Sequence, residues 1–326
     1  HFLEHMVFKG PEDMDALSVN LAFDRLGAQY NAFTSEEATV YYGAVLPEHG
    51  PSLLALFSRL MRPALRPEDF EVERQVILEE IARYQDRPGY VAYEWARKGF
   101  FGDHPLGQSV LGTPETIRAL TPAAMARYHH RRYRTGNMVL LATGRVDFEA
   151  LLAQAEALTE GFPGGEAERA YPPLVPQVGL SERPYEKASQ LYLVALFPGF
   201  AYQEEARFAA QVLAYLLGEE GSGRLHFALV DRGLAEVAAF GHEEGDRAGF
   251  FHAYVQADPA YRGAVLEALE ETLARLEREG VGEEEVERAK TPLATSLVFA
   301  GETPMGRLSH LGLEYLYTGY PLTLEE

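Results

Sequence analysis

Hydrophobic positions along the chain follow two different periods. Short stretches in which apolar and polar residues alternate predict β-strands at 29–33, 39–46 and 190–197, and the first two are close enough to form a hairpin. Longer stretches with apolar residues every three or four positions lie between them and predict amphipathic helices. The clearest helix is 67–84, which begins with a proline, a residue suited to a helix's first turn. No apolar run approaches the roughly 18 residues needed to span a bilayer.

A segment rich in proline, glycine and charge, from Gly161 to Lys187, separates two regions of this mixed pattern. The length of 326 residues also suits two domains of about 150 residues each. We therefore expect a first domain at 1–165, a linker at 166–187 and a second domain at 188–326. We also expect further residues before the first position shown and after the last.

The two regions share sequence features in the same order. GAQYNAFTSEEATVYYGAV at 27–45 resembles GLAEVAAFGHEEGDRAGFFHAYV at 233–255, EVER occurs at 71–74 and 285–288, and HPL at 104–106 corresponds to YPL at 320–322. Three matches in one order indicate a duplicated unit. We predict an α+β fold of two homologous α/β-sandwich-like domains, each with a mainly antiparallel sheet and helices packed on it.

The first five residues, His1-Phe2-Leu3-Glu4-His5, carry groups suited to metal chemistry. On a helix, the first, fourth and fifth positions lie on one face. Two imidazoles there can hold one zinc ion, and Glu4 can act as the general base for an attacking water. Because the chain has no cysteine, its metal ligands must be histidines and carboxylates. A chance occurrence of the pentapeptide is the alternative.

Catalytic zinc usually has three protein ligands, so a carboxylate is expected elsewhere in the chain. The helical wheel of 67–84 has an apolar stripe formed by Phe70, Ile77, Ile81 and Tyr84. Glu73 and Glu80 fall inside or beside that stripe, whereas Glu79 points almost opposite. A carboxylate on a buried face is costly unless it is compensated. We predict Glu80 as the third ligand and Glu73 as a carboxylate that supports a ligand or faces the substrate. The alternative is that both pair with arginines at a packed interface.

These motifs together resemble the pitrilysin, or inverzincin, family of zinc metallopeptidases, and especially its short bacterial members akin to mitochondrial processing peptidase. The resemblance rests on HFLEHMVFKG at 1–10, NAFTS at 31–35, ERQVILEE at 73–80, HPLG at 104–107, LGTPETI at 111–117 and GSGRL at 221–225. It implies His1, His5 and Glu80 as zinc ligands, Glu4 as the base and Glu73 as an additional glutamate of the site. In the register of the repeat, the second half has no ligand, because these positions hold Ala209, Val212, Leu213 and Ala294. One zinc ion per chain is therefore expected.

The resemblance also implies how a peptide is held. Family members bind peptides as an added strand at a sheet edge, and the matching strand here contains Asn31, Ala32 and Phe33. An ordinary paired strand is the alternative. In larger relatives, the metal-free half supplies an arginine and a tyrosine seven residues apart, which polarise the scissile carbonyl.

Arg247 and Tyr254 have the same spacing. An odd spacing places two residues on opposite faces of a regular strand, so only a bend near 248–249 would bring them together. The alternative is a turn arginine and a half-buried tyrosine.

We therefore expect a zinc-dependent metalloendopeptidase that hydrolyses short or unfolded peptides. We expect it to work as a homodimer or as a heterodimer with a homologous metal-free subunit. One alternative is a non-catalytic structural subunit, which would be expected to have lost its ligands. Another is a metal-dependent binding module, which needs no base and leaves Glu4 unexplained. A net charge of -20 argues against nucleic-acid binding. No signal peptide is visible, and we expect a cytoplasmic location.

Overall fold

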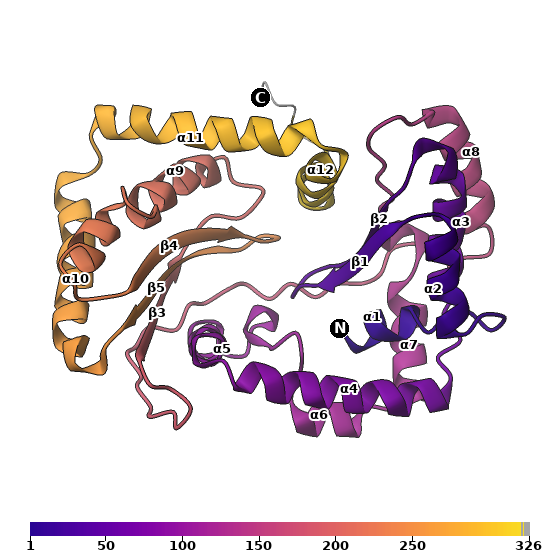
Figure 1. Ribbon diagram of the computed structural model, residues 1–326, viewed down its shortest axis with the longest axis horizontal. Helices are drawn as coiled ribbons and strands as arrows, with labels where there is room; N and C mark the ends of the chain where they lie inside the picture. Colours follow the sequence, from indigo (N-terminus) through magenta and orange to yellow (C-terminus); the bar gives the residue numbers. More distant parts are fainter. Residues whose placement is uncertain (321, 323–326) are drawn as a thin grey trace. The chain divides into compact units, whose positions relative to one another are not determined.

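The computed structural model describes residues 1–320 and 322, and it divides into two compact units (Figure 1). The first unit contains residues 1–83 and 108–172, and the second contains residues 84–107 together with those from 173 onward. The division into domains at 1–165 and 188–326 remains a prediction. The compact units differ from it mainly because residues 84–107 belong to the second unit. The end of the second predicted domain, and Pro321 of the YPL match, lie outside the described residues.

The first unit consists of a hairpin and the helices around it. Its elements are α1 (Phe2–Val7), α2 (Ala16–Arg25), β1 (Gln29–Thr34), β2 (Thr39–Ala44), α3 (Gly50–Leu60), most of α4 (Pro67–Gln85), α6 (Pro114–Ala119), α7 (Pro122–Arg132) and α8 (Phe148–Thr159). β1 and β2 pair antiparallel, with Asn31 opposite Tyr42, which confirms the predicted hairpin. In the described part of the chain, this sheet has two strands.

The core of the first unit is formed where α1, α2, α3 and α4 meet the hairpin. On α4, Phe70, Ile77 and Ile81 are buried and Tyr84 is partly buried, so the predicted apolar stripe is confirmed. α7 begins directly after Thr121, whose side chain accepts a hydrogen bond from the N–H of Ala124. None of the helices in the described residues is long and apolar enough to cross a membrane.

The second unit is built on a three-stranded antiparallel sheet of order β3-β5-β4. Its elements are α5 (Pro88–Phe101), β3 (Leu191–Pro198), α9 (Ala206–Gly218), the π-helical segment η4 (His226–Val230), β4 (Val237–Glu244), β5 (Gly249–Ala257), α10 (Arg262–Glu279), α11 (Glu283–Glu302) and α12 (Pro304–Thr318). β3 confirms the strand predicted at 190–197.

The two faces of β5 pack against different helices. Ala253 and Val255 are fully buried in a core that includes α10 and η4. The opposite face carries Phe250, which packs edge-to-face on Phe101 of α5, with 5.3 Å between ring centroids. α5 thus comes from the first half of the sequence but covers the sheet of the second unit (Figure 1).

The order of elements confirms the predicted α+β duplication. Each half has a hairpin, β1–β2 or β4–β5, preceded by a glycine at positive φ, Gly27 at 60° or Gly233 at 69°. A short 3-10 turn that begins with proline follows each hairpin and leads into a helix, α3 or α10. The next long helix, α4 or α11, contains the EVER sequence.

α12 follows α11 as α5 follows α4. Unlike α5, however, α12 packs against elements of its own half of the sequence. Arg207 of α9 pairs with Glu314 of α12 at 2.6 Å and with Glu244 of β4 at 3.0 Å. All three side chains are at most 8% exposed. Buried charges of this kind are stable when each has its partner, so the trio ties α9, β4 and α12 together.

Candidate metal centre

The helix α1 separates an apolar face from a face that carries three polar groups. Phe2, Leu3, Met6 and Val7 are each at most 7% exposed and enter the core of the first unit. At 100° per residue these four positions cover one side of the helix, so His1, Glu4 and His5 share the other side. Burial of the apolar face therefore fixes the direction in which the three polar side chains point.

A stacked pair of rings docks α1 onto α4. Phe2 lies on Phe70 with 4.5 Å between ring centroids and an interplanar angle of 23°. Glu73 follows Phe70 after nearly one turn, and Glu80 follows two turns later, so both carboxylates face the polar side of α1. Glu73 is 6% exposed, whereas the neighbour of Glu80, Glu79, points to solvent. Glu73 is compensated by His5 and by Lys9, and the half-buried Glu80 faces His1 and His5.

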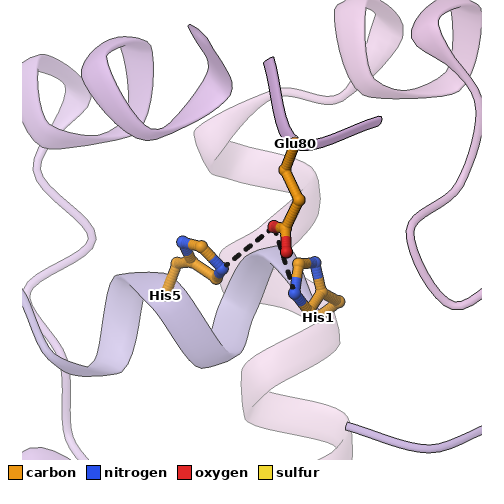
Figure 2. A group of neighbouring side chains, drawn as sticks. All are labelled: His1, His5 and Glu80. Carbon is orange, nitrogen blue, oxygen red and sulfur yellow. Dashed lines mark ion pairs between the residues drawn. The ribbon is translucent and has the colours of Figure 1, made fainter. Parts of the chain in front are cut away.

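Figure 2 shows His1, His5 and Glu80 pointing toward one another. Nε2 of His1 lies 3.6 Å from Oε2 of Glu80, and Nε2 of His5 lies 3.8 Å from the same oxygen. The three ligand atoms lie within 4.8 Å of one another, and this is the only group of three or more potential ligands found among the described residues. Ligand atoms at about 2 Å from a tetrahedral zinc ion are about 3.3 Å apart, so the donor set and its spacing fit zinc.

Glu73 supports the cluster from behind His5. Its Oε2 lies 2.9 Å from Nδ1 of His5, and its Oε1 forms an ion pair with Nζ of Lys9. Burial opposes ionisation of Glu73, but the hydrogen bonds from His5 and Lys9 and the charge of Lys9 outweigh it and lower the pKa of this carboxyl. An ionised Glu73 can only accept, so Nδ1–H of His5 donates this hydrogen bond and Nε2 of His5 is left as the nitrogen that faces Glu80.

Glu4 is held by the hairpin. The Oγ1 hydroxyl of Thr34, at the end of β1, donates a hydrogen bond to Oε2 of Glu4. Two tyrosines lie close enough to Glu4 to be affected by its charge, and their hydroxyls, of Tyr41 and Tyr133, are 2.8 Å apart. Burial raises the pKa of Tyr133 to about 12 and raises that of Tyr41 as well, and the charge of Glu4 adds to both shifts. Both phenols are therefore neutral at pH 7.

Three of the predicted site residues of the first unit lie close together. The structure brings His1, His5 and Glu80 together and turns Glu79 away, although the roles of the three as metal ligands remain a prediction. The alternative is that Glu73 and Glu80 pair with arginines, and the structure shows such a contact for Glu80. Glu80 lies 3.5 Å from Arg83, whose side chain is 66% exposed, whereas the ion-pair partners of Glu73 are His5 and Lys9.

The predicted substrate strand is β1. Asn31 is exposed, Phe33 is 44% exposed, and the N–H of Ala32 donates to Oδ1 of Asn31 at 2.9 Å. Within the described residues, β1 pairs only with β2. Its use as a peptide-binding edge remains a prediction.

Arg247 and Tyr254 both belong to the second unit. Arg247 lies in the turn before β5 with a φ of 61°, its side chain is 72% exposed, and its Nε is 3.8 Å from Asp246. Tyr254 is half-buried in β5, and its hydroxyl lies so close to Gly89 of α5 that a Cβ there would be 2.5 Å away. Their participation in catalysis remains a prediction.

Sequence reasoning did not single out Lys9 and Thr34. Both lie inside motifs that we used, HFLEHMVFKG and NAFTS, but we assigned them no role. One signal was available, because Lys9 is the only lysine or arginine among residues 1–24. The only cation in the segment that carries the two histidines is a natural partner for Glu73, the carboxylate predicted to lie near them.

If the chain is the peptidase that its motifs predict, Thr34→Val is expected to lower kcat about 10-fold, because it removes the hydroxyl that holds Glu4 and keeps the side-chain shape. Thr34→Ser retains a hydroxyl and should retain most of the activity. Steady-state kinetics on one peptide substrate measure both effects. Thermal unfolding of the same variants serves as the control, because the hydroxyl of Thr39, across the hairpin, itself lies 3.3 Å from that of Thr34. A fall in the unfolding temperature that accounts for the loss of kcat would show that Thr34 acts only through the hairpin's stability.

Comparisons with known proteins match both halves of the chain. Residues 1–114 match the insulinase family (peptidase family M16), and residues 119–293 match the peptidase M16 inactive domain. An uncharacterized zinc protease of Streptomyces coelicolor is 32% identical over all of this chain and 73% of its own length. An uncharacterized zinc protease of Bacillus subtilis is 30% identical, again over all of this chain and over 80% of its own length.

Two solved structures share the fold. The peptidase M16 inactive domain from Pseudomonas fluorescens superposes with a TM-score of 0.87 over 99% of this chain and 82% of its own, at 22% identity. A protease from Helicobacter pylori superposes with a TM-score of 0.84 over 98% of this chain and 79% of its own, also at 22% identity. The match to the inactive domain includes Ala209, Val212 and Leu213, three of the four positions at which the repeat register finds no ligand, and it ends one residue before the fourth, Ala294.

Proposed function

Because the chain belongs to the peptidase M16 family, we propose that it is a zinc-dependent endopeptidase that hydrolyses short or unfolded peptides. One observation carries the proposal. Two imidazole nitrogens, of His1 and His5, face the same oxygen of Glu80, while Glu4 lies on the same face of α1. A structural subunit has no need of this set, and a binding module has no need of Glu4.

The roles of the residues follow from their positions. His1, His5 and Glu80 would hold one zinc ion per chain, and Glu73 would orient His5. Bound zinc would supply Lewis-acid polarisation and would lower the pKa of water. Glu4 would take the proton from the attacking water and deliver it to the leaving amine, and Thr34 would hold its carboxylate in position.

The substrate would lie as an added strand on β1. An extended peptide bound in this way is recognised mainly by its backbone, which places little demand on its sequence. The N–H of Ala32, now held by the side chain of Asn31, is a donor that such a peptide could take over. The exposed ring of Phe33 would contact a substrate side chain. Most of the backbone of a folded protein is already paired, so short or unfolded peptides are the expected substrates.

The second unit has no counterpart of the metal centre in its described residues. Arg247 and Tyr254 are its candidates for polarising the scissile carbonyl. If they do not reach the site, a homologous metal-free subunit with its own arginine and tyrosine would supply these groups. We favour a partner subunit.

Purified full-length protein is expected to contain one zinc ion per chain but to turn over peptides slowly when it is alone. Metal analysis and hydrolysis of a mixed library of short peptides measure both properties, for the chain alone and with candidate homologous partners. Tyr254→Phe is the diagnostic variant, and Tyr192→Phe on the neighbouring strand is its control. Fast turnover by the chain alone that is abolished by Tyr254→Phe and kept by Tyr192→Phe would refute the need for a partner.

A further inference from the structure

Lys9, Glu73 and His5 form a row of three charged or polar groups behind the metal centre. Nζ of Lys9 pairs with one oxygen of Glu73, and the other oxygen lies 2.9 Å from Nδ1 of His5. We propose that Lys9 is a positioning residue for the metal ligand His5 and acts on it through Glu73. This inference rests on the proposed function, because it takes His5 to be a zinc ligand.

The two oxygens of Glu73 have separate tasks. A carboxylate is planar, so fixing one oxygen also fixes the direction of the other. With Oε1 held by Lys9, Oε2 stays directed at Nδ1 of His5, and the ring of His5 keeps its Nε2 toward Glu80. A carboxylate behind a ligating histidine fixes the ring's orientation in this way in many zinc sites.

The backbone around Lys9 is constrained independently of its ion pair. Gly10 has a φ of 91°, and a Cβ there would lie 2.6 Å from the carbonyl oxygen of Met14, so the turn after Lys9 requires glycine. Arg66 donates hydrogen bonds to the carbonyl oxygens of Lys9 at 3.1 Å and of Met14 at 2.8 Å. The turn therefore places Lys9 beside α4 before any contact with Glu73 is considered.

The charges explain why a cation is needed at this position. Glu73 is 6% exposed, and a buried carboxylate requires a compensating charge or several hydrogen bonds. His5 can compensate it only in part, because a zinc ligand must be a neutral imidazole. Lys9, with a side chain 23% exposed, supplies the full positive charge. Without Lys9, the carboxylate would gain by turning toward water and away from His5.

The test is the zinc affinity of the full-length protein, measured by competition with a chromophoric chelator. Lys9→Met is expected to weaken zinc binding about 10- to 100-fold, the range typical of residues that support a ligand. Lys9→Arg keeps the cation and should stay within about 3-fold of the wild type. Lys290→Met, which removes an exposed lysine paired with Glu287, is the matched control and should leave the affinity unchanged.

A double-mutant cycle separates this role from a merely structural one. If Lys9 acts through Glu73, the double variant Lys9→Met with Glu73→Gln should bind zinc no more weakly than Glu73→Gln alone. Additive losses would overturn the inference, and so would a Lys9→Met variant that binds zinc normally. Circular dichroism of the zinc-free proteins checks the fold, with Lys9→Gln as the second variant. Loss of the fold in both would assign Lys9 a structural role.

The result also distinguishes this inference from the proposed function. A wild-type protein that binds no zinc would overturn both. A wild-type protein that binds zinc with Lys9→Met unaffected would overturn the role of Lys9 alone. Zinc binding without peptide hydrolysis would contradict the proposed activity. The zinc affinities of the wild type and Lys9→Met would still decide the role of Lys9.

Discussion

Glu4→Gln is expected to lower kcat by about 10²- to 10⁴-fold while zinc binding and the fold are retained. Glutamine has nearly the shape of glutamate and can still contact Thr34, but it cannot accept a proton from water. In the proposed mechanism, the carboxylate that is lost handles a proton and does not hold the metal. Hydrolysis of one peptide, zinc content and thermal unfolding of the same preparation measure the three properties.

The control for this variant is Glu48→Gln, which makes the same chemical change at an exposed position. It should leave kcat unchanged. Near-normal hydrolysis by Glu4→Gln would rule out Glu4 as the general base. Loss of zinc together with activity would instead assign Glu4 a part in holding the metal.

Two adjacent glutamates on α4 give the second large effect. Glu80→Gln is expected to weaken zinc binding more than about 100-fold, because it replaces a carboxylate that faces both histidines and that we propose as the third ligand. Glu79→Gln should leave zinc binding unchanged, because its side chain points to solvent. Equilibrium competition with a chelator measures both affinities.

The pair is its own control, since the two substitutions are identical and lie one residue apart on the same helix. Any general effect on α4 would weaken both variants alike. Strong loss of zinc in Glu79→Gln with normal binding in Glu80→Gln would overturn the assignment of the third ligand.

Helical periodicity predicted the directions of side chains well. The apolar stripe of 67–84 placed Glu73 and Glu80 toward the core and Glu79 outward, and their exposures agree. The same argument placed His1, Glu4 and His5 on one side of α1. Both results follow from the regular 100° step of a helix, which needs no knowledge of the partner.

Helical periodicity cannot predict the contacts that irregular segments make. Lys9 follows the end of α1, so no wheel predicts where its side chain points, and its position depends on the turn at Gly10 and on Arg66. Thr34 is at the end of a strand whose distance from α1 is set by packing. The pairing of α5 with β3 and β5 was also missed, because an apolar helix face fits any apolar sheet face of suitable shape.

The position of α5 has a practical meaning for dissecting this protein. The second unit is not encoded by one continuous stretch, since it takes residues 84–107 from the first half of the sequence. A fragment cut in the proline- and glycine-rich segment at 161–187 would leave behind the helix whose Phe101 covers Phe250. The remaining fragment would expose an apolar sheet face to water and would be prone to aggregate. A fragment that keeps this unit whole therefore needs residues 84–107 joined to those from 173 onward.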